Sequence, residues 1–216
     1  MVPAAPPVNI PRSYETLPLT DVKASHHREG APVATPVVVV TLSRPDKNNV
    51  ISTHLMDSFE KDDLLRWRRP EGGVGIAITL PCAIRIACEQ AKYRFVFARG
   101  GLTLESSSSF FLPRLIGYSH AMYLLTTGHV LPPTSPHFGS LFAETRPEPA
   151  QVLSHELELA TEIVGNVSLL AWHLNYALMW HNPGTAEESH VIDSTVIYHI
   201  FDGRDMQEGS KSFLEK

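Results

Sequence analysis

Glu105 is the only carboxylate between Gln90 and Ala143, and it stands directly before four serines. One interpretation is a charged residue in the first turn of a helix, where the helix dipole favours an anion. The other is a general base surrounded by apolar groups, where loss of water raises the pKa of a carboxyl towards neutrality. The apolar neighbours in the sequence are Leu102, Leu104, Phe110 and Phe111. Periodicity does not separate the two interpretations.

A glycine-rich turn at Gly72, Gly73 and Gly75 is the second place where chemistry is available, because bare backbone N–H groups bind anions. The segment does not match GxGxxG, and no acid follows at the spacing that a ribose contact needs, which argues against a dinucleotide site. Two interpretations stay open. The turn is purely structural, or its N–H groups form part of an anion or oxyanion site.

Other candidate motifs are weaker. "GYSHA" at 117–121 is close to the nucleophile elbow G-x-S-x-G, but Ala121 replaces the second glycine and no strand is predicted before it, so Ser119 is expected to cap a helix. His155 and Glu156 begin an HExxH motif without its second histidine. Cys82 and Cys88 lack metal-binding spacing and are expected to be free thiols. We expect no bound metal.

Composition restricts the class of protein. The chain has 216 residues, 43% apolar and 19% charged, with a net charge of -5, as in an ordinary globular domain. Its densest basic run, "RWRR" at 66–69, is too short for a nucleic-acid site. The apolar window 74–88 contains Pro81 and Arg85 and is too short to cross a membrane. Without a signal peptide or a C-terminal serine-lysine-leucine, we expect a soluble intracellular protein, cytoplasmic or peroxisomal.

The elements that must position these residues begin after a proline-rich segment. Residues 1–35 hold six of the 17 prolines and are expected to form an extended or disordered lead-in, so the fold should start near Pro36. "VVVVTL" at 37–42 predicts a strand buried on both faces, and a helix capped by Ser52 should follow. The character of the sequence changes abruptly at Pro70.

Beyond the glycine-rich turn, "IAITL" is expected to start a helix that Pro81 ends, and short strands are predicted at 83–87 and 93–97. The remaining sequence has a helical period. The predicted helices cover residues 106–112, 119–127, 149–165, 168–181, 187–201 and 205–214. Asn166 or Ser168 is expected to cap the fourth of them, and Gly128 to end the second. An early β/α part is thus followed by a helical tail.

Three segments carry a resemblance to a known family: "VVVVTLSRPDKNNVIS", "GGVGIAITLPCAIRIACEQAKYRFVFARGGLTLESSSSFFLPRLIG" and "DMQEGSKSFLEK". Over residues 36–216 the chain resembles the enoyl-CoA hydratase/isomerase (crotonase) family, most closely its fungal and bacterial members. The resemblance implies an α/β spiral of β-β-α repeats with a C-terminal helical region that forms homotrimers or hexamers. It also implies an acyl-CoA thioester substrate, which brings its own coenzyme A and needs no resident cofactor.

The resemblance assigns roles to the two candidate features. Family members stabilise a thioester enolate with two backbone N–H groups, and one of these falls on Val74, between Gly73 and Gly75. The loop that carries the other is missing, together with several dozen residues near 66–72. Residues that align with contacts to coenzyme A are Lys47, Val50, Phe213 and Lys216.

The acids favour one reaction class. Family hydratases use two glutamates to activate water, and those positions align with Ala77 and Phe97 here, neither of which accepts a proton. The isomerases use one glutamate, which aligns with Glu105. The resemblance thus implies an enoyl-CoA isomerase/hydratase, most closely an isomerase, in fatty-acid or secondary-metabolite metabolism. The alternative is a catalytically impaired remnant that acts as a binding or oligomer subunit.

Overall fold

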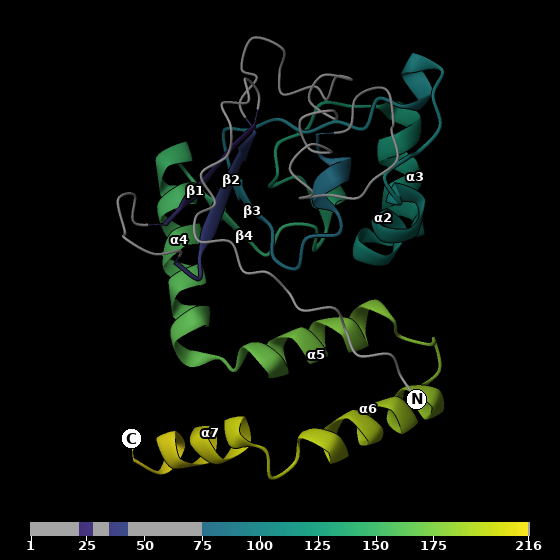
Figure 1. Ribbon diagram of the computed structural model, residues 1–216. Helices are drawn as coiled ribbons and strands as arrows, with labels where there is room; N and C mark the ends of the chain where they lie inside the picture. Colours follow the sequence, from purple (N-terminus) through teal and green to yellow (C-terminus); the bar gives the residue numbers. More distant parts are fainter. Residues whose placement is uncertain (1–21, 28–34, 43–74, 216) are drawn as a thin grey trace. The chain divides into compact units, whose positions relative to one another are not determined.

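The computed structural model describes residues 22–27, 35–42 and 75–215 (Figure 1). The chain divides into two units, Met1–Leu157 and Glu158–Lys216, which are described separately below. The predicted positions at Lys47, Val50, Ser52, Gly73 and Val74 lie outside the described residues.

An antiparallel hairpin opens the described part of the first unit. Strand β1, Val22–His26, pairs with β2, Val38–Leu42, so that Val22 lies opposite Leu42. The predicted strand at 37–42 is confirmed, but its burial on both faces is wrong, since Val40 is 44% exposed. Because β2 is paired in the described residues with β1 alone, one of its edges stays without a strand partner there.

The hairpin shows that the expected extended or disordered lead-in, residues 1–35, contains a strand. β1 lies inside residues 1–35, so the ordered fold begins before Pro36. The sequence around β1 has few large apolar side chains and does not identify a strand by itself. The backbone groups along one edge of β1 pair with β2, and the His27 N–H continues the pairing by donating to Val37 O at 2.9 Å.

The middle of the first unit is built from short elements. They are the 3-10 helices η2 (Ala77–Thr79), η3 (Ala98–Gly100) and η4 (Pro136–Phe138), and the parallel strands β3 (Ile86–Cys88) and β4 (Glu144–Arg146). The helix expected at "IAITL" is only the single turn η2, directly before Pro81. β4 was not predicted.

Arg85 explains why the strand predicted at 83–87 starts later, at Ile86. Its guanidinium donates to Leu141 O at 2.7 Å, to Leu80 O at 3.0 Å, and to Cys82 O. These contacts close residues 80–85 into turns and delay the strand. The strand predicted at 93–97 is wrong in a similar way, because only Tyr93 forms a bridge, with Leu131.

Helices form the rest of the chain. They are α2 (Ser108–Ile116), α3 (Tyr118–Thr127), α4 (Pro149–Asn166), α5 (Leu169–Trp180), α6 (Ala186–Ile200) and α7 (Arg204–Leu214). All six predicted helices are confirmed, with ends that differ by a few residues. Ser168 caps α5 by accepting from the Ala171 N–H at 3.1 Å, as expected. Ser119 does not cap α3: Gly117 occupies that position, and Ser119 lies inside the helix.

The core of the first unit forms where α2 and α3 lie side by side (Figure 1). Its buried side chains are Ala77, Leu80, Phe95, Phe97, Leu112, Ile116, Ala121, Leu124, Phe138 and Leu141. The apolar alternation of "YRFVF" thus brings Phe95 and Phe97 into this core although no strand forms there. The segment between them and α2 contains Glu105.

The described residues of the second unit, 158–215, include no fully buried side chain. α5 nevertheless reads "LLAWHLNYALMW", in which only His173 and Asn175 are polar. A helix that is apolar on all sides is normally buried. Here Trp172 is 42% exposed and Met179 is 74% exposed. In the isolated chain, this unit leaves a large apolar surface uncovered.

Candidate active site

Glu105 lies in a tight turn that leads into α2. Its carbonyl oxygen accepts from the Ser108 N–H at 2.9 Å and from the Ser108 hydroxyl. Between them, Ser106 and Ser107 both have positive φ, at 52° and 57°. Non-glycine residues rarely adopt this conformation, and each costs on the order of 1–3 kcal/mol. We call Glu105–Ser108 the serine turn.

The serine turn separates Glu105 from the helix. α2 begins at Ser108, and its first turn contains no acid. The interpretation of Glu105 as a first-turn charge is therefore wrong. The helix expected at 106–112 starts two residues late because left-handed residues at 106 and 107 cannot belong to a right-handed helix.

The Glu105 carboxyl group is partly withdrawn from water. The side chain is half-buried, and its Oε1 atom is buried without a hydrogen-bond partner among the residues that the structure describes. Burial raises the pKa of Glu105 above the ordinary value for a glutamate, because the charged form loses hydration. A buried carboxylate oxygen that no group satisfies can accept a proton from a bound molecule.

The four apolar residues close to Glu105 in the sequence differ in their burial. Leu104 and Phe111 are half-buried and pack against the core. Leu102 and Phe110 are more open, with exposed fractions of 49% and 45%, and the Arg114 guanidinium lies 3.7 Å above the Phe110 ring. The neighbours of Glu105 thus include both core residues and residues at the surface.

The two positions that the resemblance aligns with the hydratase glutamates are apolar and buried. Ala77 has no exposed surface and Phe97 is 4% exposed. Both side chains belong to the hydrophobic core. Neither contributes an acid, so Glu105 is the one of the three aligned positions with a titratable group.

The remaining predicted positions are only partly described. Gly75 lies in a half-buried turn directly before η2. Gly73 and Val74, with the expected oxyanion N–H, fall outside the described residues, as do Lys47, Val50 and Lys216. Phe213 lies on α7 in the second unit and is 81% exposed.

Two other groups of titratable residues form structural contacts. His155 Nε2 lies 3.1 Å from Glu144 Oε2, and Arg146 Nη2 lies 2.6 Å from the same oxygen. Hydrogen bonding from His155, aided by Arg146, lowers the pKa of Glu144. His137 stacks on Tyr123 at 3.9 Å between centroids. In the described part of the chain, no group of three or more His, Cys, Asp or Glu side chains could hold a metal ion.

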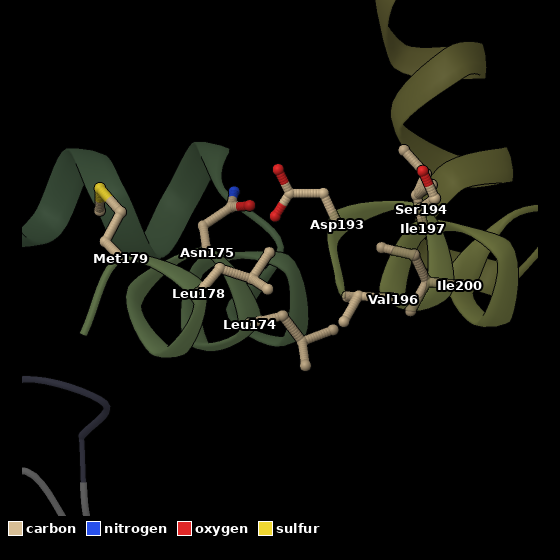
Figure 2. A pocket seen from close by; sticks show the side chains of 9 residues that line it. All are labelled: Leu174, Asn175, Leu178, Met179, Asp193, Ser194, Val196, Ile197 and Ile200. Atoms are coloured by element: carbon tan, nitrogen blue, oxygen red, sulfur yellow. The ribbon is translucent and has the colours of Figure 1, made fainter. Parts of the chain in front are cut away.

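An apolar groove of about 620 Å³ lies between α5 and α6 (Figure 2). Its apolar lining comes from Leu174, Leu178, Met179, Val196, Ile197 and Ile200. Asn175 and Asp193 point toward one another from the two helices. None of the predicted site residues lines the groove. Across residues 22–27, 35–42 and 75–215, no helix has the length and apolarity to span a bilayer.

A family model described as "Enoyl-CoA hydratase/isomerase" matches residues 70–216. The chain belongs to the enoyl-CoA hydratase/isomerase family. The resemblance inferred from the sequence is confirmed. The family match covers α2 through α7 together with the serine turn, and the α/β architecture described above is an incomplete crotonase-like fold.

Similar proteins have related names. The chain is 42% identical over 144 residues to the "Enoyl-CoA hydratase AFT3-1" of Alternaria alternata, covering 67% of this chain and 49% of the relative. The "Enoyl-CoA hydratase ACTT3" of the same organism has the same identity and coverage. The chain thus spans about half the length of the curated relatives it matches.

A solved structure has a similar fold. The enoyl-CoA hydratase from Mycobacterium avium superposes with a TM-score of 0.60 at 22% identity, covering 80% of this chain and 92% of that chain. At this identity the similarity concerns the fold alone.

Sequence reasoning missed Ser108 as a residue of interest. It is the only fully buried polar side chain in the described residues. One signal was present: Ser108, Leu112 and Ile116 are spaced by four and share the buried face of α2. A serine on an otherwise apolar helix face needs a hydrogen-bond partner, and the Glu105 carbonyl is that partner.

Proposed function

We propose that this protein shifts a double bond within an enoyl-CoA thioester, with Glu105 as the group that carries the proton. The observation that carries the proposal is the half-buried Glu105 carboxyl, whose Oε1 has no hydrogen-bond partner in the described part of the chain and whose pKa is raised by burial. A base that works near neutral pH needs such a raised pKa. The family and the family's thioester substrates provide the chemical context.

The proposed reaction uses one carboxyl group twice. The Glu105 carboxylate removes a proton from C2 of a 3-enoyl-CoA, and the C–H electron pair enters the conjugated enolate, whose oxygen is negative. The protonated Glu105 then returns the proton to C4. The enolate collapses to the 2-enoyl-CoA, and Glu105 is again ionised. The Val74 N–H is proposed to bind the enolate oxygen.

Hydration is the second candidate, because the curated relatives are named enoyl-CoA hydratases. Adding water to a 2-enoyl-CoA needs a base for the water and an acid for C2. With Ala77 and Phe97 at the aligned positions, Glu105 would have to perform both steps. This argument favours isomerisation over hydration.

The experiment offers the purified chain a 3-enoyl-CoA and, separately, a 2-enoyl-CoA. We expect a 2-enoyl-CoA product from the first, seen by its conjugated thioester absorbance. With deuterium at C2, part of the label should appear at C4, since one carboxyl carries it. A 3-hydroxyacyl-CoA from the second substrate, without isomerisation of the first, would establish hydration instead.

The matched variants are Glu105→Gln and Glu158→Gln. Glu105→Gln should lower isomerase turnover roughly 10²- to 10⁴-fold, the usual contribution of a general base. Glu158 is exposed on α4, so its variant should retain wild-type turnover. Equal activity in wild type and Glu105→Gln would exclude the proton shuttle. CoA-thioester binding without any turnover would favour the catalytically impaired binding subunit.

We also propose that copies of this chain assemble through α5–α7 as a homotrimer or hexamer. The supporting observation is the apolar surface of these helices, on which Leu169, Trp172 and Phe213 are exposed. Light scattering coupled to gel filtration tests it. The wild type should have three or six times the chain mass, and Leu169→Glu should lower it. A monomeric wild type would refute the assembly.

A further inference from the structure

We propose that the serine turn positions the Glu105 carboxyl group, with Ser108 as its key positioning residue and Ser106 and Ser107 as the strained link. This inference rests on the proposed role of Glu105 as the proton carrier. It concerns how the chain keeps that carboxyl group in a half-buried place.

Glu105 lacks a side-chain anchor at Oε1 among the described residues. That atom is buried, and none of the residues 22–27, 35–42 and 75–215 donates a hydrogen bond to it. Free of such a bond, a glutamate side chain would turn its oxygens towards water, because an unsatisfied buried carboxylate is costly. What keeps the side chain in place must therefore act through the backbone and the packing around it.

One residue, Ser108, holds the backbone of Glu105 with two hydrogen bonds. Both the N–H and the hydroxyl of Ser108 donate to the Glu105 carbonyl oxygen. Ser108 is itself fixed, because its side chain has no exposed surface and α2 places Leu112 in the core one turn later. The position of the Glu105 main chain is thereby tied to the core.

The backbone between Glu105 and Ser108 is strained. Ser106 and Ser107 have left-handed conformations that favour glycine, with φ of 52° and 57°. Ser107 is also held from the helix side, since its carbonyl accepts from the Phe110 N–H at 3.0 Å and the Phe111 N–H at 3.1 Å. Backbone strain of this kind persists only where the surrounding structure enforces it, and it concentrates at functional sites.

These observations separate a positioning role from a structural one. If the serine turn only starts α2, its loss lowers stability and leaves the titration of Glu105 alone. If it positions the carboxyl group, its loss lets Glu105 reach water. The pKa of Glu105 then falls towards its ordinary value, because desolvation is the cause of its rise.

The experiment titrates the Glu105 carboxyl group by infrared difference spectroscopy, with Glu105→Gln used to assign its band. The variants are Ser108→Ala and its matched control Ser109→Ala. Ser109 is the exposed neighbour with the same side chain, outside the turn. We expect Ser108→Ala to titrate at lower pH than the wild type, and Ser109→Ala to titrate like the wild type.

Turnover adds a second readout. Ser108→Ala should lower kcat roughly 10- to 100-fold with little change in KM, as a small misplacement of a catalytic group does. The acid limb of its pH profile should move to lower pH, since the base form of Glu105 now persists there. Ser108→Thr, which keeps a hydroxyl group, should restore the wild-type limb.

A further variant keeps the proposal testable if Ser108→Ala does not fold. Ser108→Cys keeps a side chain of similar shape but offers only a weak S–H donor to the Glu105 carbonyl, so it should titrate at lower pH than the wild type. An unchanged titration in a folded Ser108→Ala or in Ser108→Cys would overturn the proposal. Because the spectrum needs no turnover, a shifted titration without isomerase activity would support the positioning role while refuting the proposed function.

Discussion

The two units of this chain differ in how far their apolar side chains are buried. In the first, Leu112 and Phe95 are 0% and 1% exposed within one core. In the second, Leu170 and Trp172 are 52% and 42% exposed although α5 is almost entirely apolar. The hydrophobic effect stabilises the first unit through contacts inside its own core. The second unit can gain the same stabilisation only from a surface that covers it.

A matched pair of leucines gives the largest expected effect. Leu112→Ala should lower the free energy of unfolding by about 2–5 kcal/mol, because it removes a buried side chain and leaves a cavity. Leu170→Ala should change it by no more than about 0.5 kcal/mol in a dilute, unassembled sample. Denaturant unfolding measures both. If Leu170→Ala becomes costly as protein concentration rises, a second copy covers α5. Equal losses for both at low concentration would break the contrast between the units.

Within the second unit, removing the cap of α5 should lower the free energy of unfolding more than truncating an exposed apolar residue such as Leu170. Ser168→Ala removes the acceptor for the Ala171 N–H and a bond from the hydroxyl to Asp205 at the start of α7. We expect a loss of about 1 kcal/mol. Amide hydrogen exchange should become faster in the first turn of α5 and stay unchanged in α2. Ser210→Ala, at an exposed serine of α7, is the control and should leave both unchanged. Faster exchange in α2 would show that the units do not open separately.

Glu105→Gln tests whether the first unit gives up stability at its proposed catalytic group. The variant should lose turnover and gain stability at neutral pH. Because the folded pKa of Glu105 lies above its unfolded value, ionisation destabilises the folded state. This cost is absent below the unfolded pKa and complete above the folded one. The variant should therefore unfold at a slightly higher temperature than the wild type at neutral pH, and at the same temperature in acid. A lower melting temperature at neutral pH would contradict the sign of the pKa shift.

The smallest effect on stability is expected from a substitution of Glu144, which lies at the surface of the first unit. Hydrogen bonding from His155 and the nearby Arg146 lower its pKa, so its contribution to stability is present above the unfolded pKa and lost as pH falls through the folded one. Glu144→Gln should slightly reduce stability at neutral pH and flatten its decline in acid. Melting curves at several pH values test this, with Glu148→Gln, beside the same strand, as control. A steeper acid decline would contradict the assignment.

Much of the helical part could be predicted from the sequence. α3, α5 and α6 follow from helical periods, from Ser168 as a cap and from Gly128 as an end, which has the expected left-handed conformation with φ of 55°. These signals are local, so they do not depend on distant residues. The family and the choice of Glu105 followed from residue patterns as well.

The short strands could not be predicted in the same way. β3 and β4 pair residues 58 positions apart in sequence, Ile86 with Glu144, and each has only three residues. Arg85 delays β3 through a bond to Leu141, which is 56 positions away in sequence. Contacts of this range leave no periodic signal, so propensity alone placed the strand too early.

The sequence by itself determined the family, the helical tail and the one aligned position that keeps an acid, because these depend on residue identity and local spacing. Only the tertiary structure decided the environment of that acid. It placed Glu105 before the helix instead of inside it, buried one oxygen without a partner, and fixed its backbone through Ser108. The physical reason is that desolvation and strain are properties of packing, which brings together residues that the sequence shows only in a row.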